Sequence, residues 1–242
     1  MSSQYHQSSK NHRWGRPPIP ATAEEWPDEW RTIVYKAYPR LPKVALPKVP
    51  PPPADLFRII DRRASRRDFS TKAIDMNMLS TVLGSSCGRR SENTFGLPLR
   101  VHPSAGGRFP LEIYPVVLCP AAGISAGVYH YNIAEHSLDT LWEHAWTPEE
   151  VGLISSYPWV KDASVLIFLS AIFQRTQMKY GERGYRYILL EAGHIAQNIV
   201  LTAEALDLRC SPLVGTNDAH VEDVLKIDGV SESLVYTLVL GS

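Results

Sequence analysis

The chain has 242 residues, and 44% of them carry hydrophobic side chains, which is enough apolar surface for one sizeable folded core. Lys and Arg balance Asp and Glu at 25 each, so the formal net charge is zero. The chain therefore lacks the positive field with which proteins attract nucleic acid or anionic membranes. We expect a globular protein whose partner is small or neutral.

The cysteines and the apolar runs exclude further classes of protein. Cys87, Cys119 and Cys210 are odd in number and include no C-x-x-C pair, which argues against a disulfide framework and against a structural zinc site. The polar amino terminus lacks the apolar run of a secretory signal, and the longest apolar stretch, residues 164–173, is too short to cross a bilayer as a helix. We expect a reduced, cytoplasmic protein without a metal and without a membrane segment.

The first 53 residues differ in composition from the rest. They hold eleven of the 19 prolines and end in a run of four. Proline fixes φ and lacks the N–H, so regular secondary structure is disfavoured there. The aromatic residues of this segment, Trp26 and Trp30 among them, nevertheless indicate packing, because exposed tails rarely carry many large rings. We expect residues 1–53 to be an N-terminal arm that wraps over the body or a partner subunit, and residues 54–242 to be the folded domain.

The body combines helix and strand patterns. Helical spacing predicts short helices after Asp55 and Asp75, the second ending at Gly84, and a capping box predicts a helix start at Thr147. Further helices are expected over 184–206 and 218–226, strands over 111–119, 127–131, 138–143, 164–173, 210–214 and 234–240, and loops over 88–110 and 177–187. This mixture predicts an α+β fold.

The first candidate site is a turn rich in arginine. Arg63, Ser65 and Arg67 alternate directly after a predicted helix, so in an extended turn two guanidinium groups and a hydroxyl can converge on one phosphate. A solvated basic turn has the same spacing. The spacing therefore leaves both interpretations open.

The second candidate is a run of small residues. Pro103, Ser104, Ala105 and Gly106, followed by Gly107, would let backbone N–H groups approach a planar or anionic ligand closely. A glycine turn that only connects two elements is the alternative.

The third candidate is Lys179 beside Tyr180, in a predicted loop at the mouth of a pocket. A lysine that is partly desolvated near other cations loses pKa and can act as a base, and a phenol can relay the proton. The alternative is a solvated lysine beside a packing tyrosine.

Other polar residues leave less specific signals. Glu191, His194, Gln197 and Asn198 lie along one side of the predicted long helix and could line a pocket or face solvent. No glycine fingerprint of dinucleotide-binding proteins, no P-loop and no G-x-S-x-G motif occurs in the sequence.

In their order along the chain, the motifs resemble the nitroreductase superfamily, and specifically its SagB/ThcOx-type FMN-dependent dehydrogenases. The motifs that carry the resemblance are RRASRRDF at 62–69, PSAGG at 103–107, GVYHY at 127–131, KYGER at 179–183 and EAGHIAQN at 191–198. Together they span most of the chain from about residue 30 to 240.

The resemblance implies a sandwich with a central, mostly antiparallel sheet flanked by helices, and a homodimer with FMN at the subunit interface. It implies that the flavin is contacted by Arg63, Ala64, Ser65 and Arg67 at the phosphate and ribityl chain, by Pro103, Ser104, Ala105 and Gly106, and by the loop of Val214 and Gly215. Ala64 stands where related nitroreductases usually have a larger polar residue, so phosphate binding would rest on Arg63 and Arg67, or on Arg186.

The resemblance also implies a reaction. In azoline oxidases of this branch a Lys-Tyr pair acts at the substrate, and Lys179 and Tyr180 occupy the similar position. The implied activity is dehydrogenation of a thiazoline or oxazoline in a peptide or carrier-protein-bound intermediate to the azole, with a cyclodehydratase or synthetase as partner. An NAD(P)H-dependent nitro- or quinone-type reductase and a catalytically silent subunit of a biosynthetic complex are the alternatives.

Overall fold

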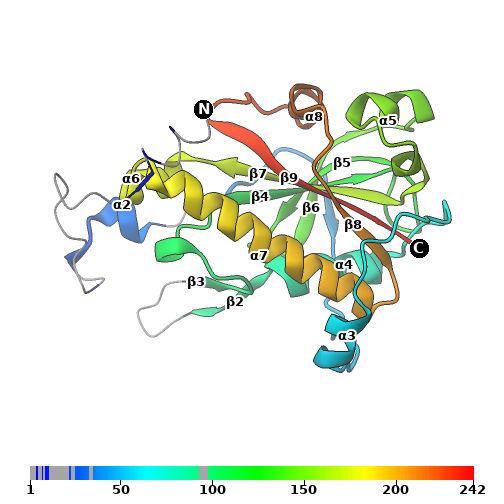
Figure 1. Cartoon of the computed structure of the whole chain (residues 1–242), viewed down its shortest axis with the longest axis horizontal. Helices are drawn as coiled ribbons and strands as arrows, with labels where there is room; N and C mark the ends of the chain where they lie inside the picture. Colours follow the sequence, from blue (N-terminus) through cyan, green and yellow to red (C-terminus); the bar gives the residue numbers. More distant parts are fainter. Residues whose placement is uncertain are drawn as a thin grey trace.

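The computed structural model describes residues 25–32, 35–92 and 98–242, with positions 4, 7, 9, 10 and 22. At its centre is a seven-stranded sheet in which all neighbouring strands are antiparallel (Figure 1). In order across the sheet, the strands are β1 (Lys43–Ala45), β6 (Ser137–Glu143), β5 (Gly127–Asn132), β4 (Leu111–Val117), β7 (Val165–Ile172), β9 (Glu232–Gly241) and β8 (Arg209–Leu213). The predicted α+β fold with a central antiparallel sheet is confirmed.

Helices cover both faces of this sheet (Figure 1). One face packs against α4 (Met76–Cys87) and α7 (Arg183–Ala205), and the other against α5 (Pro148–Ile154), η3 (Pro158–Asp162) and α8 (Asp218–Leu225). Side chains alternate along β7: Ile167 and Leu169 face the α4 and α7 side, and Leu166 and Phe168 face the other. A strand between two helical layers is buried on both faces, which is why its sequence is a continuous apolar run.

Side-chain caps define the helix starts. Asp55 accepts hydrogen bonds from the N–H groups of the first turn of α3 (Leu56–Arg62), and Asp75 does the same for α4. Thr147 and Glu150 form the predicted capping box of α5. The prediction that the second helix ends at Gly84 is wrong. Helix α4 continues to Cys87, and the small residue instead makes room for a neighbouring imidazole, which a Cβ at Gly84 would approach to 3.1 Å.

Two predicted loops contain regular structure. Between 88 and 110 lie a small antiparallel hairpin, β2 (Arg89–Glu92) with β3 (Pro98–Arg100), and the 3-10 turn η2 (Ala105–Gly107). Between 177 and 187 the chain ends one helix, α6 (Gln174–Tyr180), and begins α7. The hydrophobic pattern did not predict helix α6, because its buried residues are polar: Arg175, Thr176 and Lys179.

Part of the predicted arm packs on its own chain. The Nζ atom of Lys36 bonds the Tyr114 hydroxyl at 2.7 Å and a Glu232 carboxylate oxygen at 2.5 Å, and the Tyr38 N–H donates to Asp139. Strand β1, also within the first 53 residues, is an edge strand of the main sheet. The short helix α2 (Asp28–Arg31) lies beyond the N-terminal end of α7 (Figure 1). The boundary between arm and domain at residue 53 stays a prediction.

Two features are absent from the part of the chain that the structure describes. None of its helices has both the length and the apolar character that crossing a membrane requires. Nor does it contain a group of three or more His, Cys, Asp or Glu side chains placed to hold a metal ion.

Candidate functional site

The arginine turn lies beside the edge strand β8. The N–H of Arg66 donates to the Cys210 carbonyl at 3.0 Å, which holds the extended segment after α3 against the start of β8. Glu204 of α7, only 6% exposed, lies 3.2 Å from Nε of Arg62 and 3.8 Å from Nε of Arg66. Two of the four arginines are thus committed to a buried carboxylate.

The other two arginines are those that the sequence predicts for a phosphate. Within the described part of the chain, Arg63 and Arg67 form no ion pair, and Arg67 lies against the ring of Trp159, 5.7 Å from its centroid. The convergence of Arg63, Ser65 and Arg67 on one phosphate stays a prediction, and the exposed Ala64 adds no polar group.

The Val214 and Gly215 loop follows the other end of β8. The Ser155 hydroxyl donates to the Gly215 carbonyl at 2.9 Å, and a Cβ on Gly215 would lie 2.5 Å from the ring of Tyr157. Val214 is 88% exposed. The arginine turn and this loop therefore lie at opposite ends of one edge strand, about 17 Å apart.

A second group of predicted residues meets near the N-terminal end of α7. The Ser104 hydroxyl donates to the buried carboxylate of Glu191 at 2.6 Å and accepts a hydrogen bond from the N–H of Phe109 at 2.8 Å. These two bonds hold Pro103 and the 3-10 turn that begins at Ala105. Gly106 has a φ of 61°, and a Cβ there would lie 2.5 Å from the Tyr180 hydroxyl and 3.0 Å from Nζ of Lys179. Glycine is required by both the backbone and the close approach.

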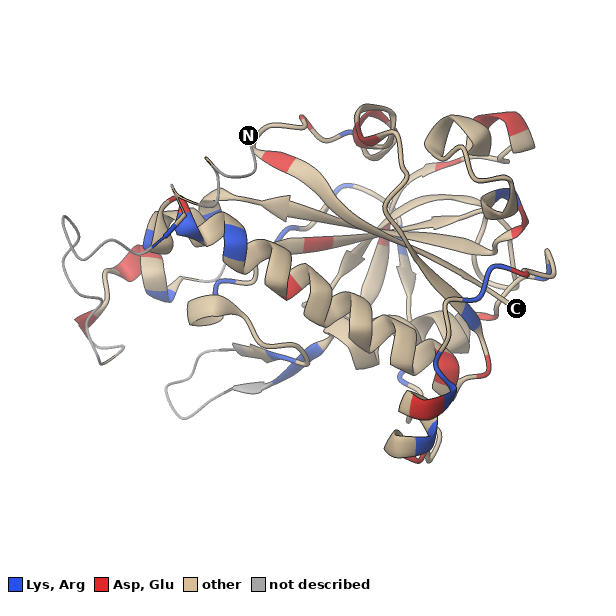
Figure 2. Cartoon of the chain, viewed as in Figure 1, with Lys and Arg blue, Asp and Glu red and all other residues tan. Residues whose placement is uncertain are grey.

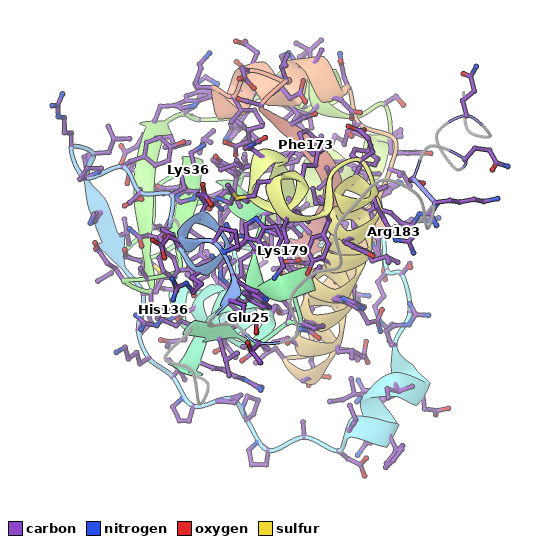
Figure 3. The ribbon with its side chains drawn as sticks, turned by 90° about the vertical axis from the view of Figure 1, so that its left-hand side faces the viewer. Glu25, Lys36, His136, Phe173, Lys179 and Arg183 are labelled. Carbon is purple, nitrogen blue, oxygen red and sulfur yellow. The ribbon has the colours of Figure 1, made fainter. Side chains whose placement is uncertain are left out.

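Lys179 lies in an aromatic enclosure. The residue is 7% exposed, and its Nζ atom has no hydrogen-bond partner among the described residues. This atom is 3.0 Å from the ring centroid of Trp26, 5.1 Å from that of Trp30 and 5.7 Å from that of Tyr180. Figure 3 looks onto this end of the molecule and shows Lys179 near its centre, close to the N-terminal segment that contains Glu25.

The environment changes the acidity of both members of the pair. Burial, together with the positive charge of Arg108, lowers the pKa of Lys179 to about 8. Burial, together with the neighbouring Tyr187, raises the pKa of the Tyr180 phenol. The pair therefore consists of an amine that can lose its proton near neutral pH and a phenol that keeps its own.

Arg108, Trp26 and Trp30 are site residues that the motifs do not reveal. The Arg108 guanidinium donates to the Trp30 carbonyl at 2.5 Å and to the Arg175 carbonyl at 2.9 Å, so it ties α2 to α6. Two features of the sequence could have pointed to these residues: Arg108 directly follows the PSAGG turn, and the arm is rich in aromatic residues.

The predicted polar side of α7 does not act as one surface. Glu191 is buried on Ser104, and the Asn198 amide donates to the Ser86 carbonyl at 3.2 Å. His194 and Gln197 are exposed.

The two groups of site residues lie at opposite ends of α7. Glu191 contacts the glycine turn and Glu204 contacts the arginine turn, and these positions are about 20 Å apart along the helix axis. Figure 1 shows α6 at one end of α7 and α3 at the other. Within one chain, the arginine turn and Lys179 therefore do not meet.

A cavity of about 670 Å³ lies away from both groups, between α4 and the turn after β5. Lys48, Arg89 and Arg90 contribute positive charge to its lining, and His136 contributes an imidazole. None of the predicted site residues lines it.

The fold and these sites define an α+β sandwich with an arginine-rich turn and a lysine–tyrosine pair. The Nitroreductase family model matches residues 60–242, and the chain belongs to this family of oxidoreductases. The resemblance predicted from the motifs is confirmed at this level.

Curated relatives extend the comparison. MJ1384 of Methanocaldococcus jannaschii, which carries a nitroreductase name, is 30% identical over 169 residues, 70% of this chain and 83% of that protein. The trifolitoxin-processing protein TfxB of Rhizobium leguminosarum is 36% identical over 143 residues, 57% of this chain and 38% of that protein. The microcin B17-processing protein McbC of Escherichia coli is 27% identical over 139 residues, 53% of this chain and 49% of that protein. The chain thus spans less than half the length of TfxB and McbC.

Solved structures share the fold. A nitroreductase-type structure from Anabaena variabilis has a TM-score of 0.70 at 26% identity, over 99% of this chain and 45% of that chain. A chain of the E. coli microcin synthetase McbBCD complex with truncated pro-MccB17 has a TM-score of 0.61 at 18% identity, over 100% of this chain and 91% of that chain. A nitroreductase-type structure from Desulfovibrio desulfuricans in complex with FMN has a TM-score of 0.55 at 15% identity, over 78% of this chain and 87% of that chain.

Proposed function

We propose that this protein binds FMN, with the phosphate held by Arg63, Ser65 and Arg67. The observation that carries the proposal is the pairing of the arginines in the turn. Glu204 forms ion pairs with Arg62 and Arg66. In the described part of the chain, Arg63 and Arg67 have no carboxylate partner. Two guanidinium groups without a carboxylate partner, four residues apart in one turn, suit a phosphate. The neighbour from Desulfovibrio desulfuricans, solved with FMN, supports the choice of anion.

The placement of the remaining contacts supports a location for the flavin. A mononucleotide lying along β8 from the arginine turn would approach the backbone of Val214 and Gly215 at the other end of this strand. The turn at Gly106 and the side chain of Lys179 are beyond the reach of one flavin in the same chain, because about 20 Å of α7 separates the two groups. These residues must therefore act on a flavin held by another chain.

We infer a homodimer in which two copies of α7 pack in opposite directions. Leu189 and Leu190 are 40% and 57% exposed, and Gly193 has open space around it, so the middle of α7 presents an apolar, closely approachable face. Beyond its charged start, most of the α7 ribbon in Figure 2 has the colour of uncharged residues. A two-fold axis through this face would place Lys179 of one copy beside the arginine turn of the other.

Subunit complementation tests this arrangement. Two chains with different affinity tags, one carrying Arg67→Ala and the other Lys179→Ala, are co-expressed, and the mixed dimers are isolated. If each site combines both chains, one of the two sites in every mixed dimer is intact, and the activity is about half that of the unmodified dimer. A mixture of Arg63→Ala with Arg67→Ala is the matched control and stays inactive, since both residues belong to the same half-site. Failure of the first pair to recover activity contradicts the shared site.

The surface of α7 has its own test. Leu190→Glu places a charge on the proposed dimer face and is expected to give monomers in light scattering, together with loss of bound flavin. Leu153→Glu, at a similarly exposed position (58%) on α5, is the control and leaves the dimer intact. A dimeric Leu190→Glu protein contradicts this interface.

We propose further that the protein dehydrogenates an azoline ring in a peptide to the azole. When bound, FMN supplies the two-electron acceptor. Lys179, with its lowered pKa, takes the proton from one ring carbon, and the Tyr180 phenol, which stays protonated, orients the ring or relays the proton. The similarity to TfxB and McbC, processing proteins of trifolitoxin and microcin B17, supports a peptide substrate.

The test of this activity uses an azoline-containing peptide with Lys179→Met and Tyr180→Phe. Both variants should keep the flavin content of the unmodified protein and lose most of the turnover, because only proton transfer is impaired. Full turnover with unchanged FMN content contradicts the assignment of the pair. The McbBCD complex of the fold neighbour supports a synthetase or cyclodehydratase partner, which co-purification with a neighbouring biosynthetic protein would test.

The nitroreductase name of MJ1384 favours a second candidate, an NAD(P)H-dependent nitro- or quinone-type reductase. Stopped-flow absorbance separates the two activities. Rapid bleaching of the flavin by NADPH favours the reductase, whereas slow bleaching combined with turnover of an azoline peptide favours the dehydrogenase.

A further inference from the structure

The amine of Lys179 is closed off on two sides. The Trp26 ring lies 3.0 Å from Nζ on one side, and on the other side Gly106 is so close that an added Cβ would be 3.0 Å from the same atom. Nζ itself has almost no contact with solvent. A group that takes a proton from a ring carbon must come within about 3 Å of that carbon or its proton, directly or through one water. The Trp26 indole occupies the space that such a ring needs.

We propose that the space over Lys179 is a subsite for a planar aromatic or conjugated ring, and that Trp26 of the same chain occupies this subsite until a ligand ring displaces it. The inference rests on the proposed function only for the identity of the natural ring, an azoline or azole. The subsite itself follows from the contacts of Lys179.

The walls of the subsite favour rings with an accessible π face. The Lys179 ammonium also lies 5.1 Å from the Trp30 ring centroid and 5.7 Å from that of Tyr180. A cation beside a π face gains electrostatic energy, most strongly with indole. The Tyr180 ring packs edge-on against Tyr187 at 5.1 Å, which leaves it a fixed wall. The subsite is therefore built for flat rings, and aliphatic side chains would lose this attraction.

The segment that carries Trp26 is suited to leave. Helix α2 has only four residues, none of them buried, and its N-cap makes no side-chain hydrogen bond. Among the described residues, Arg108 holds the other end of α2 by donating to the Trp30 carbonyl. Displacement of Trp26 would leave Trp30 tethered by Arg108, and α2 itself has no buried side chain to uncover.

Chemical labelling of Lys179 tests the proposal without an enzyme assay. The full-length protein is treated at pH 8 with an amine-directed acylating reagent, and acylation of Lys179 is followed by peptide mass spectrometry. Trp26→Ala should raise the labelling rate by about fivefold to tenfold, since it removes the indole that covers the amine. Free indole should slow labelling of Trp26→Ala back toward the rate of the unmodified protein, and cyclohexanol of similar size should not.

Two further variants serve as comparisons. Trp26→Phe keeps a ring and should label at an intermediate rate, and Trp146→Phe, on the other face of the sheet, should label like the unmodified protein. Equal labelling of Trp26→Ala and the unmodified protein overturns the proposal. So does equal protection of both by indole, because the unmodified protein should have no vacant subsite.

A kinetic measurement separates this inference from the proposed function. With an azoline peptide, Trp26→Ala should lower KM severalfold without lowering kcat, because the competing indole is gone. If no azoline peptide is turned over but labelling responds to Trp26→Ala and indole, the proposed substrate is wrong and the ring subsite stands. If azoline turnover is found and the labelling does not respond, the ring subsite is wrong and the proposed function stands.

Discussion

Neutralising Arg108 should make Lys179 a weaker source of base at neutral pH. Burial is the first cause of the lowered pKa of about 8, and the positive charge of Arg108 is the second. Arg108→Gln removes this charge and leaves the aromatic enclosure in place, so the pKa of Lys179 should rise toward its ordinary value. The amine is reactive only when deprotonated, so its reactivity increases as the pH rises through the pKa.

The size of the effect follows from the two pKa values. With a pKa of about 8, about a quarter of the Lys179 side chains are neutral at pH 7.5, whereas at the ordinary value of 10.5 about 0.1% would be. The environment thus supplies about 200-fold more base. Because Arg108 is the smaller of the two causes, we expect its removal to raise the pKa by about one unit or less, which lowers the neutral fraction at pH 7.5 by up to about tenfold.

The assay is the pH dependence of Lys179 acylation between pH 6 and 11, measured by mass spectrometry. The unmodified protein should inflect near pH 8, and Arg108→Gln at a higher pH. Arg108→Lys is the matched control: it keeps the charge but not the paired hydrogen bonds to Trp30 and Arg175, and should inflect close to the unmodified protein. The electrostatic explanation is refuted if the acylation rate of the unmodified protein inflects near pH 10.5, or if the inflection of Arg108→Gln lies at the same pH as that of the unmodified protein.

Two further predictions concern stability. Gly106→Ala should lose about 1 to 2 kcal/mol of unfolding free energy in urea titrations because of the positive φ, and most of the activity because the new Cβ displaces the Tyr180 hydroxyl. Gly107→Ala is the comparison. This position also has a positive φ, of 65°, but open space around it, so this variant should lose stability and keep its activity. Burial acts to raise the pKa of Glu112, but the hydrogen bond with His130 and the charge of Arg175 outweigh burial and lower this pKa. The Glu112 carboxylate therefore stabilises the fold fully above its unfolded pKa of about 4.5. This stabilisation is lost as the pH falls through the pKa of Glu112 in the folded protein. Glu112→Gln should therefore cost about 3 kcal/mol at pH 7 and flatten the acid dependence of stability, and an unchanged acid transition would contradict this role.

Local chemistry allowed much of the fold to be predicted. Asp75 and Thr147 cap helices as expected, because a side chain that accepts the first free N–H groups acts over three residues of sequence. Strand β7 was recognisable because a strand between two helical layers is apolar on both sides. Helix α6 was not, since its buried face carries Arg175 and Lys179, whose partners come from other elements.

For the candidate site, the motifs selected residues but not their arrangement. The spacing of Arg63, Ser65 and Arg67 predicted that these side chains can converge on one anion, and it left a solvated basic turn as the alternative. Which arginines stay unpaired depended on Glu204, which reaches the turn only when α7 packs beside α3. No local pattern contains that information.

The sequence by itself determined the fold class, the family and the residues of the glycine turn and the lysine–tyrosine pair, since these are encoded in spacing and in the order of motifs. Only the tertiary structure decided that Gly106 touches Tyr180 and that Trp26 covers Lys179, because each contact joins segments more than seventy residues apart. The lowered pKa of Lys179 is likewise a product of packing. Desolvation and the charge of Arg108 act through space, so the sequence suggested a lowered pKa near other cations but did not identify Arg108 as the charge responsible.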